Sequence, residues 1–199
     1  TTNVLAKPLL GLMQHRMQSH YHFREVWMKE YTPKYDATAR LLHWISAAVI
    51  LWATLSGFST LLLADDSAIK QIIADFNVSL TMLFIPTFLY RSIYRLRTPS
   101  PSYNNQLSNK EVRIAKAAHR LMYFLVALVL LSGVLMMAKD IELFHLIAIP
   151  HIVHNDLALT LLKKLHTLAT VLLGIGIILH LAAVVKHELA GKTMLRRIV

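Results

Sequence analysis

Three histidines interrupt an apolar stretch near the end of the chain, LHTLATVLLGIGIILHLAAVVKH at residues 165–187. His166 and His180 are 14 positions apart, nearly four helical turns, so both side chains lie on one face about 21 Å apart along the axis. His187 follows seven positions later on the same face. Because ionisable residues inside a membrane are costly and mark candidate functional sites, the stripe predicts binding chemistry. The alternative interpretation places His166 and His187 at the two interfaces, with His180 capping a neighbouring carbonyl.

Histidines within a helical bundle are suited to holding haem iron, which accepts an imidazole on each face. Zinc and copper also bind histidine, but closed structural zinc sites usually need four ligands, often thiolates, and the chain has no cysteine. Disulfides, iron–sulfur ligation and thiol nucleophiles are excluded for the same reason. Gly174 and Gly176 lie between His166 and His180, where they leave room for the edge of a macrocycle or for close packing of another helix.

Membrane-spanning helices are the elements that must position these histidines. Of the 199 residues, 55% are hydrophobic, which is too apolar for an ordinary soluble domain of this size. A bilayer takes about 20 apolar residues to cross, and four segments are long enough: 41–64, 73–94, 117–138 and 161–186. Pro86 lies inside the second and is expected to bend it rather than end it. The sequence therefore predicts an all-α integral membrane four-helix bundle.

The distribution of basic residues predicts the orientation of this bundle. The formal net charge is +10, which in so apolar a chain indicates cytoplasmic loops facing anionic lipid rather than a nucleic-acid partner. All but four of the 21 Lys and Arg residues precede the first span, join spans two and three, or follow the fourth; the exceptions are Lys70, Lys139, Lys163 and Lys164. Both termini are therefore expected in the cytoplasm. Residues 1–34 form a basic cytoplasmic N-terminal extension of the membrane domain at 35–199, and 143–154 is too short to span and is expected to cover the opposite end.

This topology sorts the histidines by depth. The cytoplasmic-side group comprises His43, His119, His180 and His187. The opposite group comprises His166 and the loop histidines His145, His151 and His154. His43 and His180 thus lie at matched depth on different helices, an arrangement that suits a flat cofactor held from both faces.

The residues around these histidines resemble the bacterial cytochrome b561 family, four-helix b-type cytochromes of the inner membrane. The resemblance covers about residues 35–199 and rests on RLLHW, AAHRLMYFL, IAIPH, KKLHTLATVLLGIGIILHLAAVVKHEL and the tail TMLRR, in that order. It implies two b haems stacked across the membrane and exchange of electrons with quinone. At least one member oxidises superoxide and passes the electrons to ubiquinone, and others carry electrons for dehydrogenases.

The resemblance also assigns roles to individual residues. His43 and His180 match the cytoplasmic-side haem ligands, and His166 matches one ligand of the other haem. His187 matches the histidine near the quinone pocket. The remaining ligand is expected at the start of the second span, where this chain has Asn77. A carboxamide is a poor ligand for haem iron, so we expect one bis-histidine haem and leave the second site open.

Several arrangements remain open on the His166 side. His166 could hold a five-coordinate haem, a loop histidine could replace the missing ligand, or the site could be empty with Asn77 and His166 hydrogen-bonded to each other. On the cytoplasmic side, His119 is a propionate or quinone contact or simply an interfacial residue. The basic residues Arg40, Lys116 and Arg120 either pair with propionates or only satisfy the positive-inside rule.

Two functional hypotheses follow. The first is a quinone-linked electron carrier of the bacterial inner membrane, with haem b as cofactor, ubiquinone as substrate, and a dehydrogenase or other electron-donor subunit as candidate partner. No nucleic-acid partner is expected. The second is a degenerate cytochrome that serves as a membrane anchor or assembly subunit. Asn77 favours the second hypothesis slightly, whereas the His43 and His180 pair and His187 argue against it.

Overall fold

The computed structural model describes residues 34–103, 106–144 and 146–199. The predicted N-terminal extension, apart from its last residue, and His145 lie outside the described residues. The helices and strands, in order, are α2 (Ala37–Ser59), a 3₁₀ turn (Thr60–Leu62), α3 (Ala68–Arg97), α4 (Asn109–Leu135), β1 (Ile141–Leu143), β2 (Ile147–Ile149), α5 (Asp156–Leu189) and a second 3₁₀ turn (Leu195–Arg197). The four α-helices of the described residues are all long and apolar enough to cross a membrane, which confirms the predicted four-helix membrane fold.

Polar side chains determine where the helices begin. Asp36 accepts a hydrogen bond from the backbone N–H of Ala39 at 2.9 Å before α2, and Asn155 accepts one from Ala158 at 2.9 Å before α5. Ser108 forms a reciprocal capping box with the third residue of α4. These caps satisfy N–H groups that the first turn of a helix leaves free. The helices therefore begin several residues before the apolar segments predicted from hydropathy.

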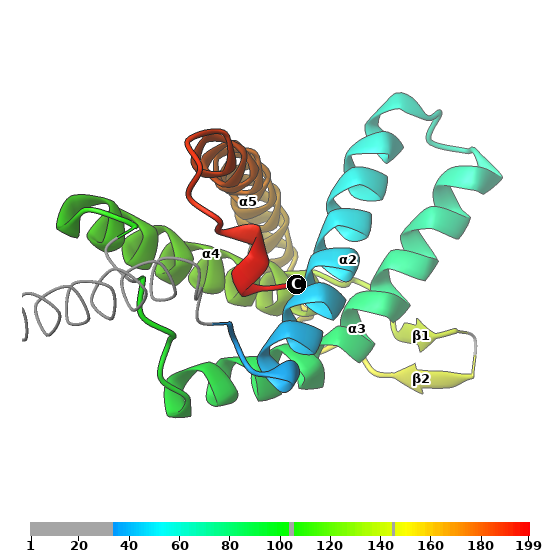
Figure 1. The fold of residues 1–199 in the computed structure, drawn as a ribbon. Helices are drawn as coiled ribbons and strands as arrows, with labels where there is room; N and C mark the ends of the chain where they lie inside the picture. Colours follow the sequence, from blue (N-terminus) through cyan, green and yellow to red (C-terminus); the bar gives the residue numbers. More distant parts are fainter. Residues whose placement is uncertain (1–33, 104–105, 145) are drawn as a thin grey trace, which may run out of the picture.

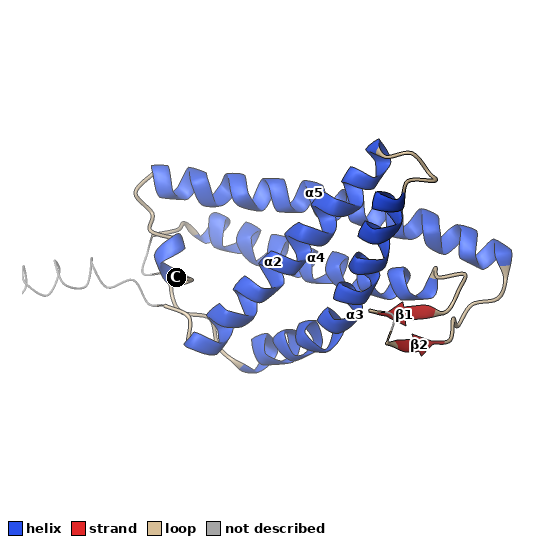
Figure 2. Ribbon diagram, turned by 90° about the vertical axis from the view of Figure 1, so that its right-hand side faces the viewer, coloured by secondary structure: helices blue, strands red, loops and turns tan. Residues whose placement is uncertain are grey.

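Helix α3 continues through Pro86. Figures 1 and 2 show the helix changing direction along its length, as expected where proline removes one hydrogen bond and crowds the preceding turn. The second half of α3 runs toward the end of the bundle where α2 begins. The prediction that Pro86 bends the span without ending it is confirmed.

The four helices are arranged as two pairs. Helix α2 packs along α3 and α4 packs along α5, and the pairs meet mainly through α3 and α4 (Figure 1). The buried apolar cluster between the pairs is small: Phe84, Phe88, Leu125, Val126 and Leu173. Many other large apolar side chains are exposed, as expected for helices that face lipid rather than water.

A β-hairpin joins α4 to α5. Strands β1 and β2 are antiparallel, with Ile141 opposite Ile149. Ser79 of α3 accepts a hydrogen bond from the backbone N–H of Phe144 at 3.0 Å and so ties the hairpin to α3. The segment predicted to cover this end therefore contains extended structure, a small exception to the all-α expectation. We call this end of the bundle the hairpin end.

The last residues of the chain pack at the opposite end, which we call the tail end. The carbonyl oxygen of Val199 accepts hydrogen bonds from Arg40 at 2.7 Å and from Lys34 at 3.2 Å. Arg197 is buried and donates at 2.7 Å to the backbone carbonyls of Ser102 and Pro101, in the loop between α3 and α4. The tail thus fastens the start of α2 to that loop.

Candidate functional site

At the tail end, the structure brings together His43 of α2 and His180 of α5. Both side chains are half-buried. His180 and His119 are neighbours of His43 in this cluster. Because α2 and α5 belong to different helix pairs, the two imidazoles come from separate parts of the bundle.

Arg91 of α3 is a member of this cluster that the sequence did not identify. Its guanidinium lies 3.1 Å from Nδ1 of His43 and 5.3 Å from the centre of the Tyr123 ring. A guanidinium can only donate, so Nδ1 of His43 accepts and a neutral imidazole carries its hydrogen on Nε2. A histidine that binds a metal through Nε2 instead carries its hydrogen on Nδ1. His43 can therefore act as an Nε2 ligand only after Arg91 has turned away from Nδ1.

His119 of α4 completes the tail-end cluster. Its ring meets the ring of His180 edge-on, with centroids 5.6 Å apart. Its Nδ1 lies 2.6 Å from the backbone carbonyl of Ala115, which can only accept, so the hydrogen is on Nδ1 and the lone pair is on Nε2. His119 is itself exposed. Its exposed ring therefore lies beside His180 at the edge of the cluster.

The other predicted tail-end residues lie around this cluster. Arg40 is bound to the carbonyl of Val199, and both Lys116 and Arg120 are exposed. His187 lies in the last turn of α5, half-buried, and its backbone carbonyl accepts a hydrogen bond from Lys192 at 2.8 Å. The role of His187 beside a quinone therefore stays a prediction.

The glycines between the two histidines of α5 lie against neighbouring helices. A Cβ added at Gly174 would lie 3.5 Å from the ring of Phe58, and one added at Gly176 would lie 3.8 Å from Met122. Both are ordinary van der Waals separations. Of the two interpretations of these glycines, this geometry supports close helix packing.

At the hairpin end, a cavity of about 270 Å³ lies between the four helices. Its walls are mostly apolar. Asn77 of α3 and His166 of α5 both line it, together with Thr170, Gly57 and Gly133. The residue that replaces the expected ligand and the residue it would have partnered therefore face the same space.

The ring of His166 is held against α4. Its Nδ1 lies 3.1 Å from the carbonyl of Val129 and 3.2 Å from the hydroxyl of Ser132. The carbonyl can only accept, so Nδ1 carries the hydrogen and Nε2 has the free lone pair. A Cβ at Gly133 would come within 3.2 Å of Cε1 of His166, so glycine at this position lets the ring lie close to the helix.

Asn77 is oriented by a different partner. Its Oδ1 accepts a hydrogen bond from the hydroxyl of Ser56 at 2.9 Å. Asn77 and His166 are therefore bound to separate groups, and the alternative in which they hydrogen-bond to each other is wrong. The same Ser56 hydroxyl lies 2.6 Å from the carbonyl of Trp52, so its single hydrogen is shared between that carbonyl and Asn77.

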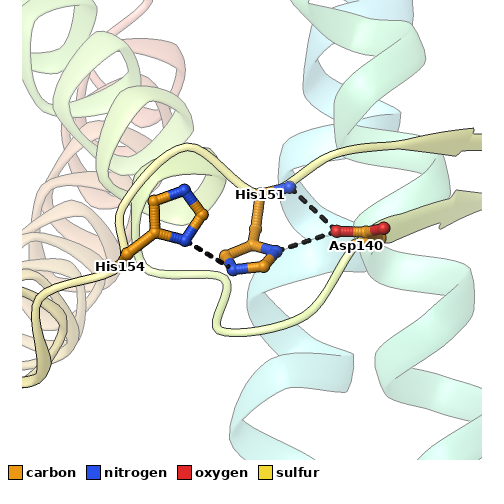
Figure 3. Close-up of polar contacts among 3 residues, drawn as sticks. All are labelled: Asp140, His151 and His154. Atoms are coloured by element: carbon orange, nitrogen blue, oxygen red, sulfur yellow. Dashed lines mark hydrogen bonds and ion pairs between the residues drawn. The ribbon is translucent and has the colours of Figure 1, made fainter.

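The described loop histidines are engaged with each other beside the hairpin. Asp140 accepts from Nδ1 of His151 at 2.8 Å, and Nε2 of His151 lies 2.9 Å from Nδ1 of His154 (Figure 3). The hydrogen bond from His151 holds the pKa of Asp140 below its usual range. Neither histidine lines the cavity, so neither takes the place of the missing ligand in this structure.

Among the described residues, no group of three or more His, Asp or Glu side chains is arranged to hold a bare metal ion. The paired and single histidines described above fit instead an ion that arrives with equatorial ligands of its own.

Comparison with protein families gives a match over most of the chain. A family model described as prokaryotic cytochrome b561 matches residues 34–199, which include all four helices and every described histidine. A comparison with curated proteins finds no match.

Proposed function

Because the chain belongs to the prokaryotic cytochrome b561 family, we propose that it carries electrons between a donor and the quinone pool, with His43 and His180 as the axial ligands of a b haem. Members of this family are membrane b-type cytochromes that act in electron transfer. One observation supports the proposal: His43 and His180 come from different helix pairs, yet both lie in the tail-end cluster, where His43 contacts Arg91 and His180 contacts His119.

The residues around the pair have separate tasks in this proposal. When bound, haem supplies a one-electron redox couple whose potential depends on its axial ligands and their hydrogen bonds. His43 and His180 hold the iron, and His119 packs edge-on against His180. For His43 to hold the iron through Nε2, Arg91 would have to leave Nδ1, and its guanidinium would then be free to donate to a carboxylate.

Quinone chemistry requires protons as well as electrons, and His187 is the residue we assign to it. His187 lies seven residues beyond His180, about 10 Å nearer the tail end along α5. A neutral imidazole can donate a hydrogen bond to a quinone carbonyl and relay a proton near neutral pH. The excess of basic residues at this end supports a cytoplasmic location for it in the bacterial plasma membrane.

The competing function is a membrane anchor or assembly subunit without redox activity. The replacement of an expected ligand by Asn77 favours it. The retention of His43, His180 and Arg91 in one cluster opposes it, because a polar cluster inside a membrane is costly unless it has a task.

A reduced-minus-oxidised visible spectrum of the purified protein separates the two functions. We expect a low-spin b-type spectrum in the wild type and its loss in His43→Ala. His119→Ala is the matched control, because it removes an imidazole from the same cluster without removing a proposed ligand. A full wild-type spectrum in His43→Ala would contradict the ligand assignment, and a protein without haem would support the anchor function.

A further inference from the structure

We propose that His151 and His154, beside the hairpin, bind a divalent cation of the first transition row, with Cu²⁺ preferred, and that Asp140 orients His151 for this task. The three side chains lie together in the segment between α4 and α5 (Figure 3). This site shares no residue with the proposed haem and quinone sites and stands independently of them.

The β-hairpin brings Asp140 and His151 together. Asp140 directly precedes β1, His151 follows the end of β2 by two positions, and the strands pair with Ile141 opposite Ile149. One oxygen of Asp140 accepts hydrogen bonds from the backbone N–H of His151 at 3.1 Å and from its Nδ1 at 2.8 Å. The same carboxylate therefore fixes both the main chain and the ring of His151.

The hydrogen bond to Asp140 prepares His151 to act as a ligand. A carboxylate can only accept, so a neutral His151 carries its hydrogen on Nδ1 and has its lone pair on Nε2. A carboxylate on the nitrogen that does not bind the metal is a common support of a metal-binding histidine, and it raises the basicity of the ligand. The hydrogen bond also holds the pKa of Asp140 below its usual range, so the carboxylate is ionised at neutral pH.

His154 supplies the second nitrogen. Its Nδ1 lies 2.9 Å from Nε2 of His151, and the two rings meet edge-on with an angle of 72° between their planes. In this arrangement a hydrogen on Nδ1 of His154 is shared with the lone pair of His151. The other neutral tautomer of His154 carries that hydrogen on Nε2, which frees a second lone pair beside the first without any change in charge.

The separation of the two nitrogens indicates which metal the pair suits. Bonds from imidazole to a metal are about 2.0–2.1 Å long, so two nitrogens 2.9 Å apart subtend about 90° at a shared ion. Neighbouring ligands make this angle in square-planar and tetragonal coordination, which is typical of Cu²⁺ and Ni²⁺, whereas structural Zn²⁺ is tetrahedral. Cu²⁺ is also the divalent ion of this row that nitrogen ligands bind most tightly.

Water completes the coordination in this proposal. Two imidazoles are fewer than the three groups that would hold a bare ion, so the ion keeps part of its own hydration shell. His154 is exposed and the side chain of His151 is 29% exposed, so a hydrated ion reaches both nitrogens. The two histidines are only three positions apart in the chain, which keeps the entropy cost of joining them at one ion small.

The test is a titration of the purified full chain, with its cofactor as isolated, with Cu²⁺ at neutral pH. We expect calorimetry to give one Cu²⁺ per chain and electron paramagnetic resonance to show two equatorial nitrogen ligands. His151→Ala and His154→Ala should each abolish the two-nitrogen signal. His119→Ala, which removes an exposed imidazole from the tail end, is the matched control and should bind Cu²⁺ as the wild type does.

Two variants of Asp140 test its positioning role. Asp140→Ala removes the acceptor and should weaken Cu²⁺ binding by about 10- to 100-fold, the usual scale for losing a group that orients a metal-binding histidine. Asp140→Asn keeps an acceptor oxygen and should recover part of this loss, which general damage to the loop would not allow. Equal affinities in Asp140→Ala and the wild type would overturn this role.

Four results would overturn the site itself or the choice of metal. The site is wrong if the wild type does not bind Cu²⁺, if the double variant His151→Ala/His154→Ala binds it equally well, or if the signal shows three or more equatorial nitrogens. Tighter binding of Zn²⁺ than of Cu²⁺ would overturn the preference for Cu²⁺. Because these measurements follow copper, a chain that binds Cu²⁺ but no haem would support this site and contradict the proposed function.

Discussion

His180 and His166 belong to the same helix, α5, but the groups around them differ. At the tail end, His180 lies in a cluster with two other imidazoles and the guanidinium of Arg91. At the hairpin end, His166 faces a mostly apolar cavity and is hydrogen-bonded to a backbone carbonyl. One end is crowded with hydrogen-bond donors, and the other is open and has a single oriented histidine.

The difference shows how the group beside Nδ1 determines whether the Nε2 of an imidazole can bind a metal. A carbonyl beside Nδ1 leaves a lone pair on Nε2, whereas a guanidinium beside Nδ1 leaves a hydrogen there. His166 is therefore ready to bind a metal in this structure, while His43 becomes ready only when Arg91 moves. The end that retains both predicted ligands is the one that must rearrange.

The difference between the two ends is tested most directly by removing one of the two α5 histidines at a time. We expect His180→Ala to abolish the low-spin haem signal, because the iron loses an axial ligand. We expect His166→Ala to leave that signal at its wild-type intensity, because it lies about 21 Å away along α5. Electron paramagnetic resonance of both oxidised variants measures this, and loss of the low-spin signal in His166→Ala would show that the ends are not independent.

A second prediction concerns quinone at the tail end. His187→Ala should keep the haem spectrum and slow reoxidation of the haem by a soluble ubiquinone analogue by about tenfold or more, the usual scale for losing a positioned acid–base group. Stopped-flow absorbance measures the rate. Lys186→Ala, in the same turn, is the control and should react at the wild-type rate. Equal rates in all three proteins would leave His187 as an interfacial histidine.

A third prediction sharpens the role of Arg91. Arg91→Leu removes a positive charge near the haem held by His43, and this favours the oxidised form. The reduction potential should fall by about 70 mV, as Coulomb's law gives for a charge about 10 Å away at an effective dielectric constant of about 20. Arg95→Leu is the matched control because Arg95 is exposed and its charge is screened. A redox titration showing equal potentials in both variants would refute the placement of the Arg91 charge beside the haem held by His43.

The smallest expected effect lies in the loop beside the hairpin. The pKa of Asp140 is lowered by its hydrogen bond with His151, so the carboxylate contributes stability above its usual pKa of about 4. That contribution is lost as the pH falls through the lower pKa of the folded state. The protection factor of the His151 amide, which donates to Asp140 at 3.1 Å, should then fall toward one. Asp140→Asn should remove this pH dependence, and a constant protection factor from pH 7 to pH 2 in the wild type would contradict it.

Hydropathy predicted the spans well because lipid imposes a minimum apolar length on each helix. It did not predict the helix ends, since Asp36 and Asn155 extend α2 and α5 through polar residues. The strands of the hairpin are three residues each, too short to give an alternating pattern in the sequence. The proposed haem and quinone roles of the histidines remain predictions.

The partners of those histidines were harder to predict. Arg40 was a candidate for the cofactor, yet it binds the carbonyl of Val199, whereas Arg91 reaches His43. Sequence gives the depth of a residue in a span, but it does not give the direction in which a bent helix points the side chain. Asn77, in contrast, could be identified from the sequence because it is a carboxamide where a histidine ligand is expected. The structure places it in the same cavity as His166.

The bend in α3 has a consequence at a distance from Pro86. Arg91 follows the proline by five residues and lies in the half of the helix that turns toward the start of α2 (Figure 1). A straight α3 would carry the guanidinium along a different line, away from His43. The bend at Pro86 therefore helps to place Arg91 beside Nδ1 of His43. In this way a proline in one helix influences which imidazole nitrogen carries the hydrogen on another helix.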